Sequence, residues 1–394
     1  MTSNALLSTI QAPPTADIQK YAFIDALRGL ACLGVIAIHI LDYVGPTWEP
    51  VRLVAAFGDK GVQLFYLLSA FTLFLSYQQR SRTDDRPILF FWIRRFFRIA
   101  PLFYAVLIVN FLWRGMSPRT WAPDGIGWDD IGLAITFLNA WKPDAITSVV
   151  DGGWSIAIEM SFYCLIPFLF CKITNLSKAL NFTCLAYMGG LILSEMGLAI
   201  AMPQADERYH RLLDHYFNVF WLPRELFVFG LGICLFFLFQ KLLSVPISPG
   251  QKRQFSRSLL WIAAMLMLAA MRRFGDVLLL FSLAWLAFTF SLALQSRIWL
   301  VNPLLIRLGK VSYSIYLLHF LVLRLLGPQL AATPWIQQNA DPFFSTLKIL
   351  FAFSLTTAVT YLLAEITFHS IEQPGLRLGK QLIARLTRSP QSAA

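Results

Sequence analysis

The stretch of residues 21–41, YAFIDALRGLACLGVIAIHIL, is apolar almost throughout and long enough to cross a bilayer as a helix. Three ionisable residues, Asp25, Arg28 and His39, interrupt it. Because an α-helix advances about 100° per residue, Arg28 and His39 fall on one face, roughly 16 Å apart along the axis. Asp25 precedes Arg28 by three residues and can pair with it. The pattern predicts a spanning helix with one polar stripe, as in a site between helices.

Nine further apolar runs follow, which gives ten predicted transmembrane helices. They lie at about residues 61–77, 99–113, 154–170, 182–202, 217–239, 259–271, 277–294, 312–326 and 346–368. The segment 80–98 carries six arginines against two aspartates, so the positive-inside rule predicts that it and both termini are cytoplasmic. Within it, the arginines and aromatic residues of 86–101 predict an interfacial helix ahead of the third span.

The run at residues 131–141 has only about eleven residues, fewer than the ~20 that a span needs. We expect it to be re-entrant or interfacial. Counting it as an eleventh span is the alternative, but that would place the basic C-terminal residues outside, against the charge rule.

Composition supports this class, because 57% of the 394 residues are hydrophobic and 14% are charged, against roughly 25% charged in soluble domains. We predict an all-α polytopic protein of the inner (cytoplasmic) membrane. The net charge of +11 comes from basic residues in short gaps between apolar runs, so we expect membrane lipids rather than nucleic acid as their partner. The five cysteines form no C-x-x-C pair and have no histidine at metal-ligand spacing, so we predict no metal site.

The predicted organisation has three parts. Residues 1–20 are polar, with no apolar signal region, and are expected to be a flexible cytoplasmic lead. Residues 21–374 form the transmembrane domain, and 375–394 a basic cytoplasmic tail.

Two residues at similar predicted depth could carry acid/base chemistry. His39 lies near the outer end of the first span and Glu159 near the outer end of the fourth. A carboxylate can orient an imidazole whose other nitrogen takes a proton from a hydroxyl. The alternative is that each residue is hydrogen-bonded only to stabilise a helix end, although ionisable groups within a membrane are functional by default.

Three arginines are ambiguous on spacing alone. Arg28 either faces a site or extends to the cytosolic headgroups. Arg95 and Arg98 share one helix face, where their guanidinium groups either hold a phosphate or anchor the helix in lipid.

In the ninth span Ser312, Tyr316 and His319 form a polar stripe, which interhelical hydrogen bonding also explains.

Together these motifs resemble the integral-membrane acyltransferase family 3, over nearly the whole chain. The resemblance rests on six segments in family order: IDALRGLACLGVIAIHI, GVQLFYLLSAFTL, the Arg95-x-x-Arg98 pair before IAPLFY, WSIAIEMSFYCLIP, VSYSIYLLH and the closing IEQP. It implies transfer of an acyl group, commonly acetyl from acetyl-CoA, to a hydroxyl on the extracytoplasmic side. The expected acceptor is a cell-surface polysaccharide, a lipid-linked sugar or a small hydroxyl compound.

The resemblance also implies residue roles. His39 is the expected catalytic histidine, Arg28 is its motif partner, and Arg95 and Arg98 are the expected contacts for the donor phosphates. Glu159 matches the first glutamate of the family's tryptophan, serine and glutamate motif. Beside the resemblance, we predict that Glu159 orients His39, that Asp25 also binds the donor, and that the substrate contacts are Trp154, Ser155, Tyr316 and His319. The soluble esterase-like domain of some relatives is not expected.

Two alternatives of other classes remain. A membrane transporter or flippase for a lipid or glycan would also place an arginine and a histidine on an intramembrane stripe. The sequence, however, shows no paired inverted repeats of the kind that secondary transporters carry. The third alternative is a catalytically silent membrane scaffold.

Overall fold

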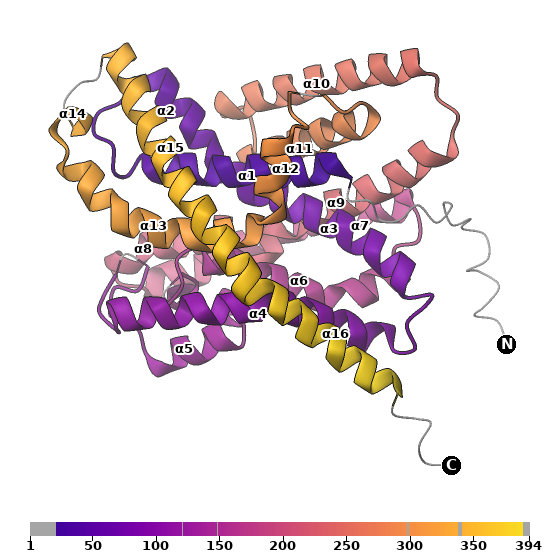
Figure 1. Ribbon diagram of the computed structural model, residues 1–394, viewed down its shortest axis with the longest axis horizontal. Coiled ribbons are helices and arrows are strands. Elements are labelled where there is room, and N and C mark those ends of the chain that lie inside the picture. The colour runs from indigo at the N-terminus through magenta and orange to yellow at the C-terminus, as the bar shows by residue number, and fades with distance from the viewer. Residues whose placement is uncertain (1–20, 120, 148, 298, 338–340, 389–394) are drawn as a thin grey trace.

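The computed structural model describes residues 21–119, 121–147, 149–297, 299–337 and 341–388. The predicted lead at 1–20 lies outside the described residues. Over the described ranges the regular structure is helical (Figure 1), with one isolated bridge between Arg119 and Ala122. The α-helices are α1 (Ala22–Ile40), α2 (Glu49–Ala56), α3 (Gly61–Arg80), α4 (Pro87–Arg114), α5 (Trp128–Ile135), α6 (Gly153–Lys172), α7 (Leu176–Ala201), α8 (Glu207–His215), α9 (Leu222–Ser244), α10 (Pro249–Met271), α11 (Val277–Leu294), α12 (Pro303–Lys310), α13 (Ser312–Ala332), α14 (Pro334–Gln337), α15 (Pro342–Thr367) and α16 (Gln373–Arg388).

Nine helical segments of the described ranges are long and apolar enough to cross a membrane. They contain α1, α4, α6, α7, α9, α10, α11, α13 and α15. The predicted class, an all-α polytopic membrane protein, is confirmed. The remaining predicted span, at residues 61–77, is α3, whose 20 residues include polar side chains such as Gln63, Ser69 and Thr72, and it is not one of the nine. A count of ten therefore stays a prediction.

The third predicted span differs from expectation. The predicted interfacial helix at 86–101 and the span at 99–113 form one continuous 28-residue helix, α4, which contains Pro101. Arg95 and Arg98 are therefore held rigidly on a helix that continues into the membrane. The run at 131–141 contains the end of the eight-residue α5 and a short 3₁₀ turn, so it does not span, as predicted.

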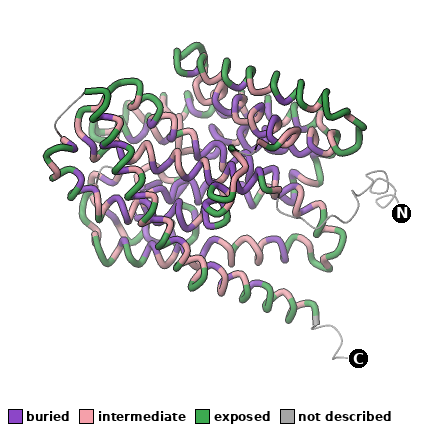
Figure 2. The backbone as a smooth tube through the Cα atoms, turned by 45° about the horizontal axis from the view of Figure 1, so that its top comes forward, coloured by how far each residue is buried: buried purple, intermediate pink, exposed green. Residues whose placement is uncertain are grey.

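The core surrounds α1, and peripheral helices such as α10 and α16 are largely exposed (Figure 2). Here α12 approaches the backbone of α1 directly. A Cβ atom added at Gly309 would lie 1.7 Å from the carbonyl oxygen of Asp25, and one at Gly29 would lie 2.3 Å from that of Leu305. Small residues allow such close contact between membrane helices, and here they fix the position of α1.

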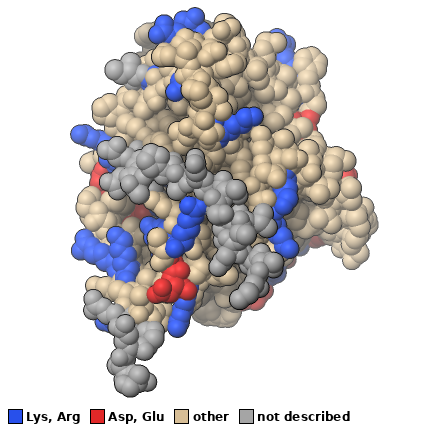
Figure 3. Space-filling view, turned by 90° about the vertical axis from the view of Figure 1, so that its right-hand side faces the viewer, with Lys and Arg blue, Asp and Glu red and all other residues tan. Residues whose placement is uncertain are grey.

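The face on the right of Figure 1 carries the connection from α3 to α4, the connection from α9 to α10 and the far end of α16. Lys and Arg side chains are spread over this face, with few Asp or Glu side chains in view (Figure 3). The positive-inside rule gives this charge pattern to a cytosolic face. The orientation of the chain stays a prediction.

Candidate active site

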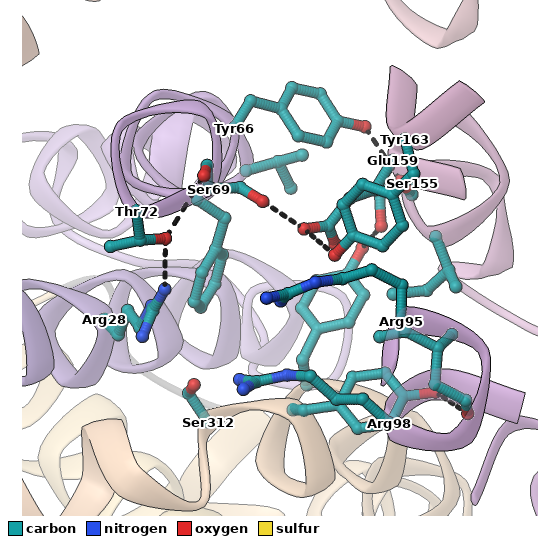
Figure 4. Close-up of a pocket in the computed structure, with 16 residues that line it drawn as sticks. Arg28, Tyr66, Ser69, Thr72, Arg95, Arg98, Ser155, Glu159, Tyr163 and Ser312 are labelled. Atoms are coloured by element: carbon teal, nitrogen blue, oxygen red, sulfur yellow. Dashed lines mark hydrogen bonds between the residues drawn. The ribbon is translucent and has the colours of Figure 1, made fainter. Parts of the chain in front are cut away.

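A cavity lies between α1, α3, α4, α6 and α13 (Figure 4). It encloses about 660 Å³ of empty space, counting the part that opens to the outside. Its lining residues are Arg28, Val62, Phe65, Tyr66, Ser69, Thr72, Arg95, Arg98, Ile99, Ser155, Ile156, Glu159, Tyr163, Ser312, Tyr313 and Tyr316. Six of the ten residues predicted for the site from sequence line its wall, namely Arg28, Arg95, Arg98, Ser155, Glu159 and Tyr316, and Ser312 of the polar stripe lines it as well. Arg28 is the only one of the six on α1.

Arg28 points into this cavity rather than toward the headgroups. Its Nη2 donates a hydrogen bond to Thr72 Oγ1 on α3 at 3.2 Å, and its Nη1 lies 3.9 Å from Asp25 Oδ1. The predicted pair of Asp25 with Arg28 is therefore formed. Asp25 itself is buried against α12 and is not part of the cavity lining, so its contact with a donor stays a prediction.

Two further arginines enter the cavity from α4. The guanidinium carbon of Arg95 lies 5.7 Å from the ring centre of Phe91 and 5.9 Å from that of Tyr163, and its Nε is buried with no hydrogen-bond partner among the described residues. Arg98 lies one turn further along the helix and extends in the same direction (Figure 4). Three guanidinium groups thus share one cavity, an arrangement suited to phosphate groups.

The contacts of Glu159 differ from the predicted contact with His39. Its carboxylate accepts hydrogen bonds from Ser69 and from Tyr163, the latter at 2.7 Å, and it lines the arginine cavity. The predicted pair of Glu159 with His39 is not among the contacts of the described residues. A similar depth was predicted for both residues, but Glu159 lines the cavity that Arg28, Arg95 and Arg98 also line. Three guanidinium groups and this one carboxylate leave a net formal charge of +2.

His39 lies beside a second histidine instead. Its ring centroid is 5.5 Å from that of His319 and 4.6 Å from that of Phe320, both on α13. His319 is completely buried, and its Nδ1 lies 2.6 Å from the carbonyl oxygen of Tyr316. Because a carbonyl only accepts, Nδ1 carries the proton and Nε2 has a lone pair, which has no partner among the described residues.

Tyr316 connects the cavity to the histidines. Its hydroxyl accepts a hydrogen bond from Ser155 Oγ at 2.7 Å, and its ring centroid is 5.7 Å from that of His319. Ser312, Tyr316 and His319 therefore run along α13 from the cavity toward His39, as the predicted polar stripe does. Of the predicted substrate contacts, Ser155 and Tyr316 line the cavity, whereas Trp154 and His319 do not. Trp154 packs in the core, with its ring centroid 4.6 Å from that of Phe220.

Sequence reasoning missed several polar residues of the cavity. Ser69 and Thr72 lie three residues apart on α3, a spacing that places them on one face. Tyr163 follows Glu159 by four residues on α6 and bonds to it. These helical spacings are visible in the sequence and could have indicated that the side chains share a helix face. No group of three or more His, Cys, Asp or Glu residues that could hold a metal ion occurs within the described ranges.

Comparison with known proteins identifies the class. A family model described as "Acyltransferase domain" (acyltransferase 3) matches residues 21–365. The chain therefore belongs to this acyltransferase family. The predicted family, fold class and enzyme class, an O-acyltransferase, are confirmed, and the chain is a multi-pass membrane protein.

Individual relatives are more distant. The chain is 27% identical to "Acyltransferase MdmB" of Streptomyces mycarofaciens, over 80% of this chain and 84% of that protein. It is 23% identical to "Peptidoglycan O-acetyltransferase OatA" of Listeria monocytogenes and 24% identical to "O-acetyltransferase OatA" of Staphylococcus aureus, covering 89% and 94% of this chain. The chain spans only 55% and 60% of those two OatA proteins. No solved structure is significantly similar to it.

Proposed function

We propose that this protein transfers an acetyl group from acetyl-CoA, bound from the cytosolic side of the inner membrane, to a hydroxyl of an extracytoplasmic acceptor. The acceptor class is a cell-surface glycan, a lipid-linked sugar or a small hydroxyl compound. The observation that carries the proposal is the convergence of Arg28, Arg95 and Arg98 on one cavity, with His39 further along the helix that holds Arg28. The relatives named O-acetyltransferase support the acetyl group.

The residues of the cavity fit an acyl-CoA donor. Coenzyme A carries phosphates at one end and the thioester at the other. Arg95 and Arg98 would hold the phosphates through charge-assisted hydrogen bonds, and the buried Arg95 Nε is a donor without a partner among the described residues. Arg28, on α1, would contact the donor nearer its thioester end. The donor supplies the activated acyl group.

The chemistry then requires a base at the acceptor hydroxyl. His39 takes the hydroxyl proton as the oxygen attacks the thioester carbonyl. A carbon–oxygen bond forms, the carbon–sulfur bond breaks, and the leaving thiolate takes up a proton to become the free thiol. His319 packs against His39 and holds its ring in place.

Label transfer tests the proposal. The purified protein, reconstituted in vesicles, is incubated with acetyl-CoA labelled in the acetyl group and with polysaccharide, lipid-linked sugar and small hydroxyl acceptors. We expect ester-linked label on at least one acceptor class. If label stays on the donor with every acceptor class, while the protein remains monodisperse, the proposal is wrong. Movement of an unmodified glycan across the vesicle without donor would favour a transporter instead.

A further inference from the structure

A second basic cluster lies at the ends of α4 and α13 that are remote from the cavity arginines. Arg114 Nη1 is 3.2 Å from Asp151 Oδ1, and Arg324 contacts the other oxygen of the same carboxylate. Arg324 also donates to Asn110 Oδ1 at 2.6 Å, and its guanidinium lies 5.5 Å from the ring centre of Trp113. Arg114 follows Arg98 by sixteen residues on α4, about 24 Å by helix rise, so this cluster is separate from the donor cavity.

The cluster has more positive than negative charge. Arg119 is close enough to Arg114 and Arg324 for their charges to interact, and it donates hydrogen bonds to the carbonyl oxygens of Gly115 and Ser117. Burial together with the charge of Arg114 lowers the pKa of Arg119 to about 10, so it remains cationic at neutral pH. Three guanidinium groups and the carboxylate of Asp151 give a net formal charge of +2. The side chains of Arg114 and Arg324 are 27% and 19% exposed, so a ligand can reach them.

This cluster adjoins the histidine pair. Phe320 packs on His39 and His319, with ring centroids 4.6 and 4.0 Å away, and Arg324 follows it by one turn of α13. Gly152, next to Asp151, has φ +70°, and a Cβ atom there would lie 2.4 Å from Cε2 of Phe320. The arginines therefore lie just beyond the histidines, on the side away from the donor cavity.

We propose that Arg114, Arg119 and Arg324 bind a phosphate or carboxylate group of an anionic acceptor and hold its hydroxyl toward His39. The inference rests on the proposed function, because it assigns a charge to the acceptor of that reaction. Guanidinium groups pair with both oxyanions through forked hydrogen bonds. Asp151 pairs with Arg114 and Arg324 and neutralises part of their charge. A bilayer headgroup offers the same phosphate chemistry, so the test must separate the two sources.

Pyrophosphate is the probe, measured by calorimetry on the full chain in a neutral maltoside detergent with coenzyme A saturating the donor cavity. A triple variant, Arg114→Gln, Arg324→Gln and Asp151→Asn, removes the cluster without leaving a lone carboxylate. We expect pyrophosphate to bind at least tenfold more weakly to this variant, with coenzyme A binding unchanged. Asp151→Asn alone should bind pyrophosphate several-fold more tightly, and Arg208→Gln, in an exposed ion-pair cluster, should match the parent.

Three results would overturn the proposal. One is equal pyrophosphate binding by the parent and by the triple variant, measured on a triple variant that keeps its thermal transition and is therefore folded. Another is weaker binding by Asp151→Asn in a folded protein. The third is loss of pyrophosphate binding when anionic phosphatidylglycerol is added to phosphatidylcholine vesicles, which would assign the cluster to lipid headgroups. None of these measurements needs acyl transfer, so failure of the proposed function would be seen separately.

Discussion

His39 on α1 and His319 on α13 lie side by side, with ring centroids 5.5 Å apart and ring planes inclined by 33°. The contact joins the first predicted span to the ninth and brings two imidazoles together in an apolar part of the bundle. No hydrogen bond between His39 and a carboxylate occurs among the described contacts. The base of the proposed reaction is therefore supported by a second histidine and by Phe320, and the predictions below follow from that arrangement.

His39→Ala should reduce acyl transfer by about 10²- to 10⁴-fold, the usual contribution of a general base. Binding of coenzyme A should be unchanged, because His39 does not line the arginine cavity. Transfer of labelled acetyl groups measures the loss. His210→Ala changes an exposed histidine on α8; it is the matched control and should keep full activity. Near-normal turnover in a folded His39→Ala protein would remove His39 from the mechanism.

His319→Gln should lower kcat by up to about 100-fold, because a misplaced catalytic group costs that much. The KM for the donor should stay the same. If His319 acts through His39, the double variant with His39→Ala should be no less active than His39→Ala alone. Additive losses in the double variant would show that His319 has an independent role.

Arg98→Gln should raise the KM for acetyl-CoA by about 10- to 100-fold, from the loss of a charge-assisted hydrogen bond worth roughly 1.5–3 kcal/mol. The acetyl thioester of N-acetylcysteamine lacks the phosphates, so its turnover should be unaffected. Arg94→Gln is the control, because Arg94 pairs with Asp84 and does not line the cavity. An equal loss with both donors would contradict a phosphate contact.

Glu159→Gln separates two roles of this residue. The amide oxygen can still accept from Ser69 and Tyr163, while the negative charge beside the three arginines is lost. We expect coenzyme A to bind a few-fold more tightly and kcat to change little. Calorimetry and steady-state kinetics measure the two effects. A collapse of kcat with unchanged donor binding would instead support the sequence-based hypothesis that Glu159 orients His39.

The sequence was sufficient for the class of fold and for the three arginines of the cavity, and the reason is local. Arg28 and His39 fall on one face of a single helix, and Arg95 and Arg98 fall on one face of another, so helix periodicity alone places them. Contacts between helices were harder to predict, because periodicity within one helix does not determine them. Glu159 was paired with His39 on estimated depth, and an error of one turn moves a side chain by about 5 Å. Nothing local in the sequence placed His319 against His39.

Gly309→Ala tests the close packing of α1 against α12. A Cβ atom at Gly309 would lie 1.7 Å from the carbonyl oxygen of Asp25, which is backbone and cannot rotate away, so the two helices must separate. We expect a loss of about 1–3 kcal/mol in stability, as for overpacking, and a higher KM for the donor because Arg28 moves with α1. Thermal unfolding in detergent measures the first effect.

The matched control for this substitution is Gly189→Ala on α7, where an added Cβ atom meets nothing within 4 Å. Alanine there should be neutral or stabilise the helix by roughly 0.5–1 kcal/mol, because glycine is the poorer helix former. If both variants unfold at the same temperature and bind coenzyme A equally, the contact between α1 and α12 does not position Arg28. If only Gly309→Ala is destabilised, with a raised donor KM, the packing of these two helices and the geometry of the cavity are coupled through α1.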